Sequence, residues 1–214
     1  MEKIYTCDVP PSVIERAQYD ADAYNDFNAK IYAKRNQKNT KKINRDMVIG
    51  LSFELGSAYP YLCEQFGNDN VEEPYVYDGT NGKKEQFSHN ADIVVFGDLN
   101  FHCKCIDPEV ARTYGYGWLF EKNYLDKNEE KLRKSEKDFV VFGSLDLNNR
   151  TSDILVIQRF GELFENDMFE VPVMRYLRDG KRVVKYSKFI EKKVAPKIEI
   201  NKLIDTMTIE KEEI

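Results

Sequence analysis

The order of the predicted elements indicates an α/β protein built around a central mixed β-sheet. Helical patterns cover residues 12–36 and 41–66, and strand patterns follow over 91–106 and 139–160. With 214 residues, 42% of them hydrophobic and 13% aromatic, the chain is long enough to bury a substantial core in one domain. This composition excludes a wholly disordered chain.

Two N-terminal helices are indicated by apolar residues at helical spacing. The first is predicted over residues 12–36, and a break at 36–40 separates it from the second, over 41–66. Pro60 is expected to kink the second helix or to end it early. One apolar face of this helix is predicted to contain Ile43, Met47, Leu51, Leu55 and Ala58.

The strands are predicted from short apolar runs bounded by turn residues. They cover residues 74–77, 91–96, 99–106, 139–147, 153–160 and 183–186. The clearest hairpin turns at residues 148–150, and Gly97–Asp98 joins the pair before it. Three further segments have weaker patterns: 118–120 fits a strand or a helix end, 126–137 a solvated helix or loop, and 162–168 a helical turn.

The charge is segregated along the chain. The net charge is −5, from 32 basic and 37 acidic residues, whereas a protein that coats nucleic acid is usually basic. Residues 28–45 nevertheless carry seven bases and no acid, and residues 175–197 carry nine bases and two acids. Both stretches fit either solvated faces or phosphate-binding patches. The candidate nucleic-acid contacts are Lys34, Lys38, Lys41, Lys42, Arg112 and Lys122.

Four residues in the middle of the chain suit metal-assisted chemistry. Glu54 lies on an apolar helix face, where an unpaired carboxylate is costly. Asp92 opens an apolar strand, although aspartate is disfavoured inside strands. Alternation places His102 and Lys104 on one face of the next strand and its two cysteines on the other. Each residue also has a structural interpretation: a helix-edge acid, a strand-entry cap, or a lysine that reaches solvent from an edge.

Two carboxylates offer hard oxygen ligands to a divalent cation. Glu54 and Asp92 are therefore the candidate ligands for Mg²⁺ or Mn²⁺, with the backbone carbonyl of Cys103 as a third. Such a cation lowers the pKa of its water and stabilises charge on a phosphate, and Lys104 would orient that water or stabilise the transition state. Zinc is not favoured, because His102 and the cysteines face opposite ways.

The run NADIVVFGDLNFHCKCID, residues 90–107, resembles the core hairpin of PD-(D/E)XK nucleases, in which an Asp on the first strand precedes an acid-x-Lys strand. Glu54 is similar to the extra acid that many members carry on the preceding helix. The resemblance covers about residues 41–190. It implies a restriction-endonuclease-like mixed β-sheet flanked by helices. The implied organisation is a helical extension over 1–40, a nuclease-like core over 41–200 and an acidic tail over 201–214.

The chain departs from the family at His102, which replaces the second acid. Histidine suits softer metals than Mg²⁺ and brings no negative charge. The resemblance implies a metal-dependent DNA endonuclease of phage or restriction type, with Glu54, Asp92, His102 and Lys104 as catalytic residues. The four cysteines fit a reduced cytoplasm, of a bacterial cell or a phage-infected host.

DNA is the expected partner, with a homodimer as a further option. No window reaches the roughly 18 apolar residues of a membrane span, so no membrane association is expected. Two alternatives remain open. The same fold could bind nucleic acid or a partner protein without cutting, or the chain could be an acidic protein that blocks a nucleic-acid enzyme.

The resemblance depends on the register of the hairpin. A two-residue turn at Gly97–Asp98 would place Asp92 opposite Cys103 and facing away from Lys104. An odd-length loop, which Gly97 favours, places Asp92 opposite His102 or Lys104 instead. We expect that loop, an Asp92 carboxylate within about 5 Å of the Lys104 amine, and the helix of Glu54 packed over the same face.

Overall fold

The computed structural model describes residues 3–34, 39–74, 91–114, 116–120, 122–165, 172–176 and 182–189. The described helices are α1 (Pro11–Lys34), α2 (Thr40–Phe53), the π-helical turn η1 (Glu54–Ala58), α3 (Tyr59–Phe66), η2 (Asn68–Asn70), α4 (Pro108–Tyr114), α5 (Lys122–Lys134) and α6 (Phe160–Glu165). The described strands are β1 (Tyr5–Asp8), β2 (Ile93–Val95), β3 (Leu99–Ile106), β4 (Gly117–Phe120), β5 (Asp138–Asp146), β6 (Thr151–Arg159), β7 (Pro172–Tyr176) and β8 (Arg182–Phe189).

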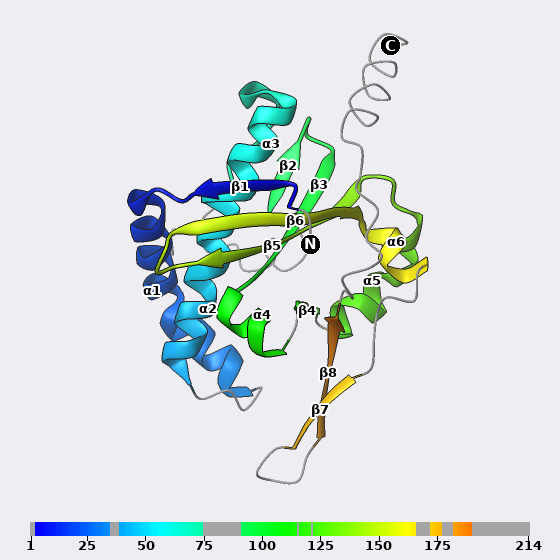
Figure 1. Cartoon of the computed structure of the whole chain (residues 1–214). Coiled ribbons are helices and arrows are strands. Elements are labelled where there is room, and N and C mark those ends of the chain that lie inside the picture. Colours follow the sequence, from blue (N-terminus) through cyan, green and yellow to red (C-terminus); the bar gives the residue numbers. More distant parts are fainter. Residues whose placement is uncertain are drawn as a thin grey trace.

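Two β-sheets organise the chain (Figure 1). The larger has five strands in the order β1-β6-β5-β3-β2; β3 and β5 run parallel, and its other neighbours run antiparallel. The smaller has the order β4-β8-β7 and is antiparallel. Its β7–β8 hairpin extends away from the larger sheet (Figure 1). The predicted α/β organisation, a mixed sheet with helices, is confirmed.

The N-terminal segment contributes a strand that was not predicted. Strand β1 pairs antiparallel with β6, with Tyr5 opposite Ile154, and forms one edge of the larger sheet. Helix α1 then begins at Pro11, close to the predicted start, and packs on α2 through the small residues Ala17 and Ala21. Strand β1 and helix α1 are therefore in contact with the sheet and with the second helix, respectively.

Residues 40–66 form a continuous helical run that contains the π-turn η1. The side chains that face the larger sheet are Ile49, Phe53, Ala58, Leu62 and Phe66. Their spacing is four, five, four and four residues, and the five-residue step lies across η1, so the extra residue of the π-turn keeps both halves facing the sheet. Of the predicted apolar face, Met47 and Leu51 point towards α1, whereas Ala58 faces the sheet. The helix continues through Pro60 to Phe66, and the local distortion is the π-turn.

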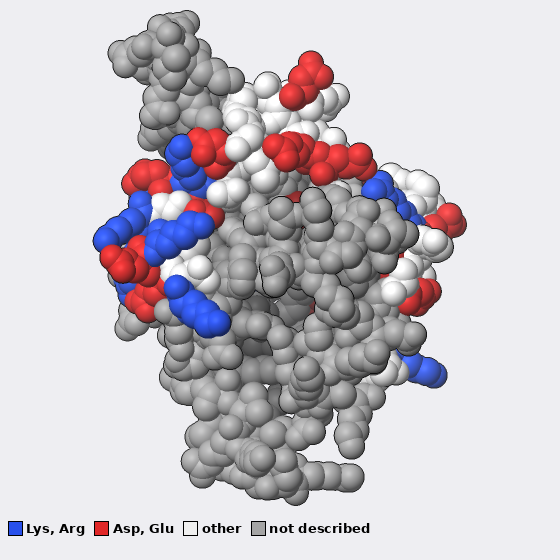
Figure 2. Space-filling view, turned by 180° about the vertical axis from the view of Figure 1, so that it is seen from behind, with Lys and Arg blue, Asp and Glu red and all other residues white. Residues whose placement is uncertain are grey.

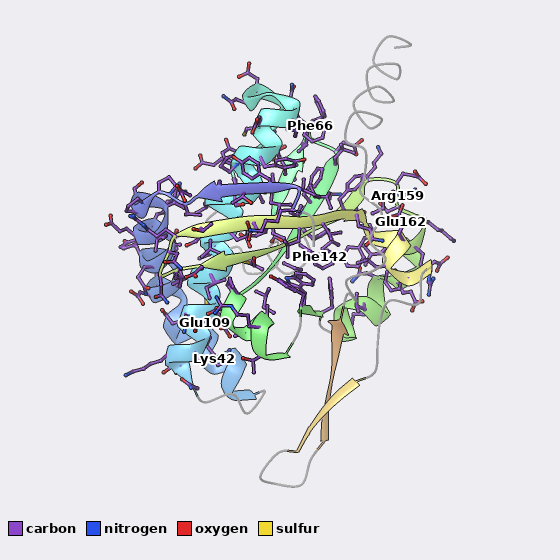
Figure 3. All side chains as sticks on the ribbon, in the orientation of Figure 1. Lys42, Phe66, Glu109, Phe142, Arg159 and Glu162 are labelled. Carbon is purple, nitrogen blue, oxygen red and sulfur yellow. The ribbon has the colours of Figure 1, made fainter. Side chains whose placement is uncertain are left out.

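Two hydrophobic cores cover the two faces of the larger sheet. The first lies under α2 and α3 and includes Phe66; the second lies under β4, α5 and α6 and includes Phe142 (both labelled in Figure 3). Trp118 belongs to the second core, and 2% of its surface is exposed. The β5–β6 pairing contains a bulge at Phe142 and Gly143.

The later elements follow the predicted order with shifted bounds. Strands β5 and β6 and their turn at 147–150 confirm the clearest hairpin, and β8 extends the predicted strand at 183–186. Strand β7 was not predicted. The expected strand at 74–77 and turn at 78–82 fall almost wholly outside the described residues, as does the tail at 201–214. None of the helices in the described part of the chain has the length and apolar character needed to cross a membrane.

Candidate functional site

The β2–β3 hairpin has the register that the family resemblance requires. Val95 pairs with Leu99, so the connecting loop contains three residues, 96–98. Phe96 and Gly97 both adopt positive φ, 54° and 70°, which gives the loop its tight reversal. The predicted odd-length loop is confirmed. Because the loop is odd, residues of equal parity on the two strands share a face, and Asp92 belongs with the even residues of β3.

Asp92 lies immediately before β2 and caps the edge of β3. Its Oδ2 atom accepts a hydrogen bond of 2.6 Å from the backbone N–H of Cys103, and its own N–H donates to the carbonyl of Phe101 at 3.0 Å. The strand-entry cap is therefore the correct structural interpretation of this residue. The N–H and C=O groups of one strand residue point to the same side, so the Cys103 carbonyl faces the same edge.

Glu54 opens the π-turn, and its side chain is half-buried. Burial raises the pKa of Glu54 well above its usual value; the nearby Asp92 charge raises it further, and Lys104 lowers it. Three of the four predicted catalytic residues are thus close enough for their charges to interact. They come from a helix, the start of one strand and the middle of the next.

The helix that carries Glu54 lies on the opposite face from the one predicted. It packs over Phe101 and Cys103, not over the face of His102 and Lys104, so that expectation was wrong. The Glu54 charge also contributes to raising the pKa of Cys103 and Cys105. The carboxyl group therefore lies beside the part of β3 that runs past the end of β2.

Lys104 is half-buried on the side of the second core. Its Nζ atom lies 5.6 Å from the centroid of the Phe120 ring, within the range of a cation–π contact. The aromatic ring belongs to β4, which pairs with β8 in the smaller sheet. The ammonium group thus contacts that ring and is also close enough to the Glu54 carboxyl group for their charges to interact.

His102 has a different set of neighbours. Its Nε2 atom lies 3.3 Å from Oδ1 of Asp138, and its ring packs edge-to-face on Phe160 at 5.6 Å between centroids. Asp138 also accepts a hydrogen bond of 2.5 Å from Ser135. The hydrogen bond from His102 holds the pKa of Asp138 below its usual value. The His102 ring is therefore held towards β5 and α6.

The cysteine side chains lie apart from His102. Cys103 belongs to the first core, whereas His102 contacts Phe160 in the second, which confirms the predicted alternation. Burial raises the pKa of the Cys103 and Cys105 thiols well above the usual value. Over the described residues, no group of three or more His, Cys, Asp and Glu side chains could hold a metal ion.

The predicted nucleic-acid contacts are spread over several elements. Lys41 and Lys42 are exposed on α2, where Lys42 pairs with Asp46 (Lys42 is labelled in Figure 3). Arg112 is exposed on α4. The side chains of Lys34 and Lys122, and the whole of Lys38, lie outside the described residues. On the face in Figure 2, the described bases alternate with acids and do not form a broad basic area.

Comparison of the chain with models of known protein families, with curated proteins and with solved structures gave no match.

Two features of the site were missed by reasoning from the sequence. The π-turn has a detectable signal, because the apolar spacing from Phe53 to Ala58 is five residues instead of four. Asp138 has a weaker one, since an acid at the start of an apolar strand after Ser135 fits a simple turn. Its pairing with His102 joins residues 36 positions apart and depends on the parallel β3–β5 contact.

Proposed function

We propose that the chain is a metal-dependent phosphodiesterase of PD-(D/E)XK type that acts on DNA. The observation that carries this proposal is the half-buried Glu54 carboxyl group on its π-turn, which is close enough for its charge to interact with those of Asp92 and Lys104. Two carboxylates brought together in a partly buried place repel each other, and a bound cation or a proton relieves that repulsion. The arrangement is costly to the fold unless it serves such a group.

The donor set fits a hard divalent cation. Glu54 and Asp92 would hold Mg²⁺ or Mn²⁺, and the Cys103 carbonyl at the same edge would add a third oxygen. When bound, the cation supplies charge stabilisation on the phosphate and lowers the pKa of its water. Lys104, whose Nζ atom lies 5.6 Å from the centroid of the Phe120 ring, would place a positive charge against the phosphate or orient the water.

His102 has a positioning role in this proposal. Its hydrogen bond to Asp138 and its contact with Phe160 fix the middle of β3 against β5 and α6. That contact keeps Cys103 and Lys104 in register without adding a negative charge to the site. A site with two acids is expected to bind Mg²⁺ weakly, because ligand charge contributes to affinity for hard cations.

Cleavage of supercoiled plasmid tests the proposal. The protein is assayed with Mg²⁺, with Mn²⁺ and with EDTA, beside the variants Glu54→Gln and Asp92→Asn. Asparagine keeps an oxygen that can accept the Cys103 hydrogen bond while it removes the charge. Asp98→Asn in the same hairpin is the matched control, since Asp98 is exposed and pairs with Lys137. We expect nicking that needs the metal and is lost in both site variants. Cleavage that persists in them would contradict the proposed site.

The second candidate function is binding without cleavage. It is favoured by the position of His102, which replaces the family acid and is paired with Asp138. In that case the protein binds DNA in EDTA with an affinity that falls steeply with salt, and no metal restores cutting. An acidic protein that blocks a nucleic-acid enzyme would bind neither DNA nor metal. The binding assay therefore separates these two alternatives, and sedimentation tests the homodimer.

A further inference from the structure

The π-turn that carries Glu54 is held from outside by the N-terminal strand. In an α-helix, the carbonyl of Gly56 would accept the N–H of residue 60, but Pro60 has no N–H to donate. The Cys7 thiol of β1 donates to that carbonyl instead, with sulfur and oxygen 3.4 Å apart. A side chain from a strand some fifty positions earlier therefore donates to the carbonyl whose α-helical donor would have been residue 60.

The same place is also a close steric contact. A Cβ atom at Gly56 would lie 2.6 Å from Cγ1 of Val9 and 3.2 Å from Cγ1 of Val13, distances shorter than ordinary carbon contacts. Glycine at this position lets the chain after β1 pass directly against the π-turn. Val9 is fully buried there, and its N–H donates to the Arg150 carbonyl at 2.7 Å in the β5–β6 turn. The segment that contacts the π-turn is thus hydrogen-bonded to the sheet.

The π-turn determines the direction of Glu54 relative to the sheet. Its defining hydrogen bond runs from the Tyr59 N–H to the Glu54 carbonyl, five residues apart. If this segment became α-helical, residues on one side of the turn would rotate by about one position, or 100°. Phe53 or Ala58 would then leave the core. If both stayed, the Glu54 side chain would move away from Asp92 and Lys104.

We propose that Cys7 is a positioning residue for Glu54: together with Val9 it clamps the π-turn whose geometry holds the Glu54 carboxyl group beside Asp92 and Lys104. The clamp concerns the structure of the π-turn alone, whereas its relevance to catalysis rests on the proposed function. Its parts are the missing donor at Pro60, the thiol that replaces it and the absent side chain at Gly56.

The test compares Cys7→Ala with Thr6→Ala. Both variants remove one hydrogen bond from β1, but Thr6 donates to Asp153 on the sheet, away from the turn. Hydrogen exchange of the Tyr59 amide reports the π-turn, and the side-chain carboxyl NMR resonance of Glu54 reports its surroundings. We expect Cys7→Ala to speed Tyr59 exchange several-fold and to move the Glu54 resonance, whereas Thr6→Ala leaves both unchanged. Cys7→Ser, which keeps a donor, should restore at least part of the protection.

Pro60→Ala provides an independent variant. It returns an N–H to residue 60, so the Gly56 carbonyl gains a helical donor that competes with the thiol. Tyr59 exchange should again speed up although the substitution removes a helix-breaking residue. Equal Tyr59 protection in the wild type, Cys7→Ala and Pro60→Ala would overturn the clamp. Mn²⁺ titration by calorimetry is read separately: failure of the wild type to bind overturns the proposed metal site and leaves the clamp result standing.

Discussion

The carboxylate of Asp92 accepts a 2.6 Å hydrogen bond from the backbone N–H of Cys103. One side chain therefore does two things, because it completes the edge of β3 where β2 has ended and it places a negative charge near Glu54. A substitution at Asp92 must be chosen so that these two effects can be told apart.

Asp92→Ala is expected to lower the free energy of unfolding by about 1–3 kcal/mol, because it leaves the Cys103 N–H without its partner in a partly buried place. Asp92→Asn should lower the free energy of unfolding much less, since its amide oxygen can accept the same hydrogen bond. Urea unfolding in EDTA measures both. Equal stability of the alanine variant and the wild type would mean that the hydrogen bond contributes little and that Asp92 is held there for its charge.

Glu54→Gln is expected to change the pH dependence of stability. The pKa of Glu54 is raised in the folded protein, mainly by burial, so the folded state resists ionisation that the unfolded state undergoes above about pH 4.3. The wild type therefore loses stability relative to Glu54→Gln as pH rises from that value towards the folded pKa. Urea unfolding between pH 4 and 8 without metal checks this. A stability difference between the two proteins that does not vary with pH would show that Glu54 is ionised in the folded protein and that its charge is compensated by a neighbouring group.

For Asp138, we expect the contribution to stability to change with pH in the opposite direction. The hydrogen bond from His102 lowers the pKa of this carboxyl group, so its contribution is present above the unfolded value of about 3.9 and is lost as pH falls through the folded value. Asp138→Asn should cost about 1–3 kcal/mol at pH 7 and progressively less below pH 4. The exposed Asp69→Asn serves as a control. A cost that persists unchanged at pH 3 would contradict the His102–Asp138 pairing.

Restoring the family acid with His102→Glu is expected to destabilise the protein. The new carboxylate would lie beside Asp138, which now accepts from the His102 ring at 3.3 Å, and losing a hydrogen bond to a buried carboxyl group costs about 1–3 kcal/mol. The double variant His102→Glu with Asp138→Asn removes the repulsion and should recover part of the loss. Thermal unfolding compares the two. Calorimetry with Mg²⁺ then shows whether the new acid reaches the metal.

Neutralising Lys34, Lys38, Lys41 and Lys42 together tests the basic stretch for DNA binding. If the stretch binds phosphates, affinity falls and the log–log salt dependence flattens by up to about one unit for each phosphate that the variant no longer neutralises. Lys42 already pairs with Asp46 and should contribute least. Fluorescence anisotropy with a labelled duplex at several salt concentrations measures the slope. An unchanged slope would identify the stretch as a solvated helix face.

The sequence predicted features that depend on local pattern. The odd loop between β2 and β3, the alternation along β3 and the first two helices follow from Gly97, from strand parity and from helical spacing. Strand β1 was missed because four residues carry little pattern and their partner lies almost 150 positions away. The face that α2 presents to the sheet was also missed, since the five-residue step to Ala58 breaks the regular period on which the prediction relied.

Within the site, the charges of Glu54, Asp92 and Lys104 could be grouped from the sequence because each is unusual in its own apolar segment. The partner of His102 could not be predicted from the sequence. Asp138 reaches it through a parallel β3–β5 contact across residues that include α4, β4 and α5, and no local pattern encodes that pairing.

Gly143 connects the two hydrophobic cores through a single peptide unit. A Cβ atom there would lie 2.2 Å from Cε2 of Phe53, so that ring rests directly on the backbone from the side of the first core. From the side of the second core, the Trp118 indole N–H donates to the Gly143 carbonyl at 3.2 Å. The side chains of one core therefore cannot separate from the sheet without disturbing the packing of the other core. Heating should therefore melt both layers in one cooperative step, with tryptophan fluorescence and far-ultraviolet circular dichroism giving the same midpoint.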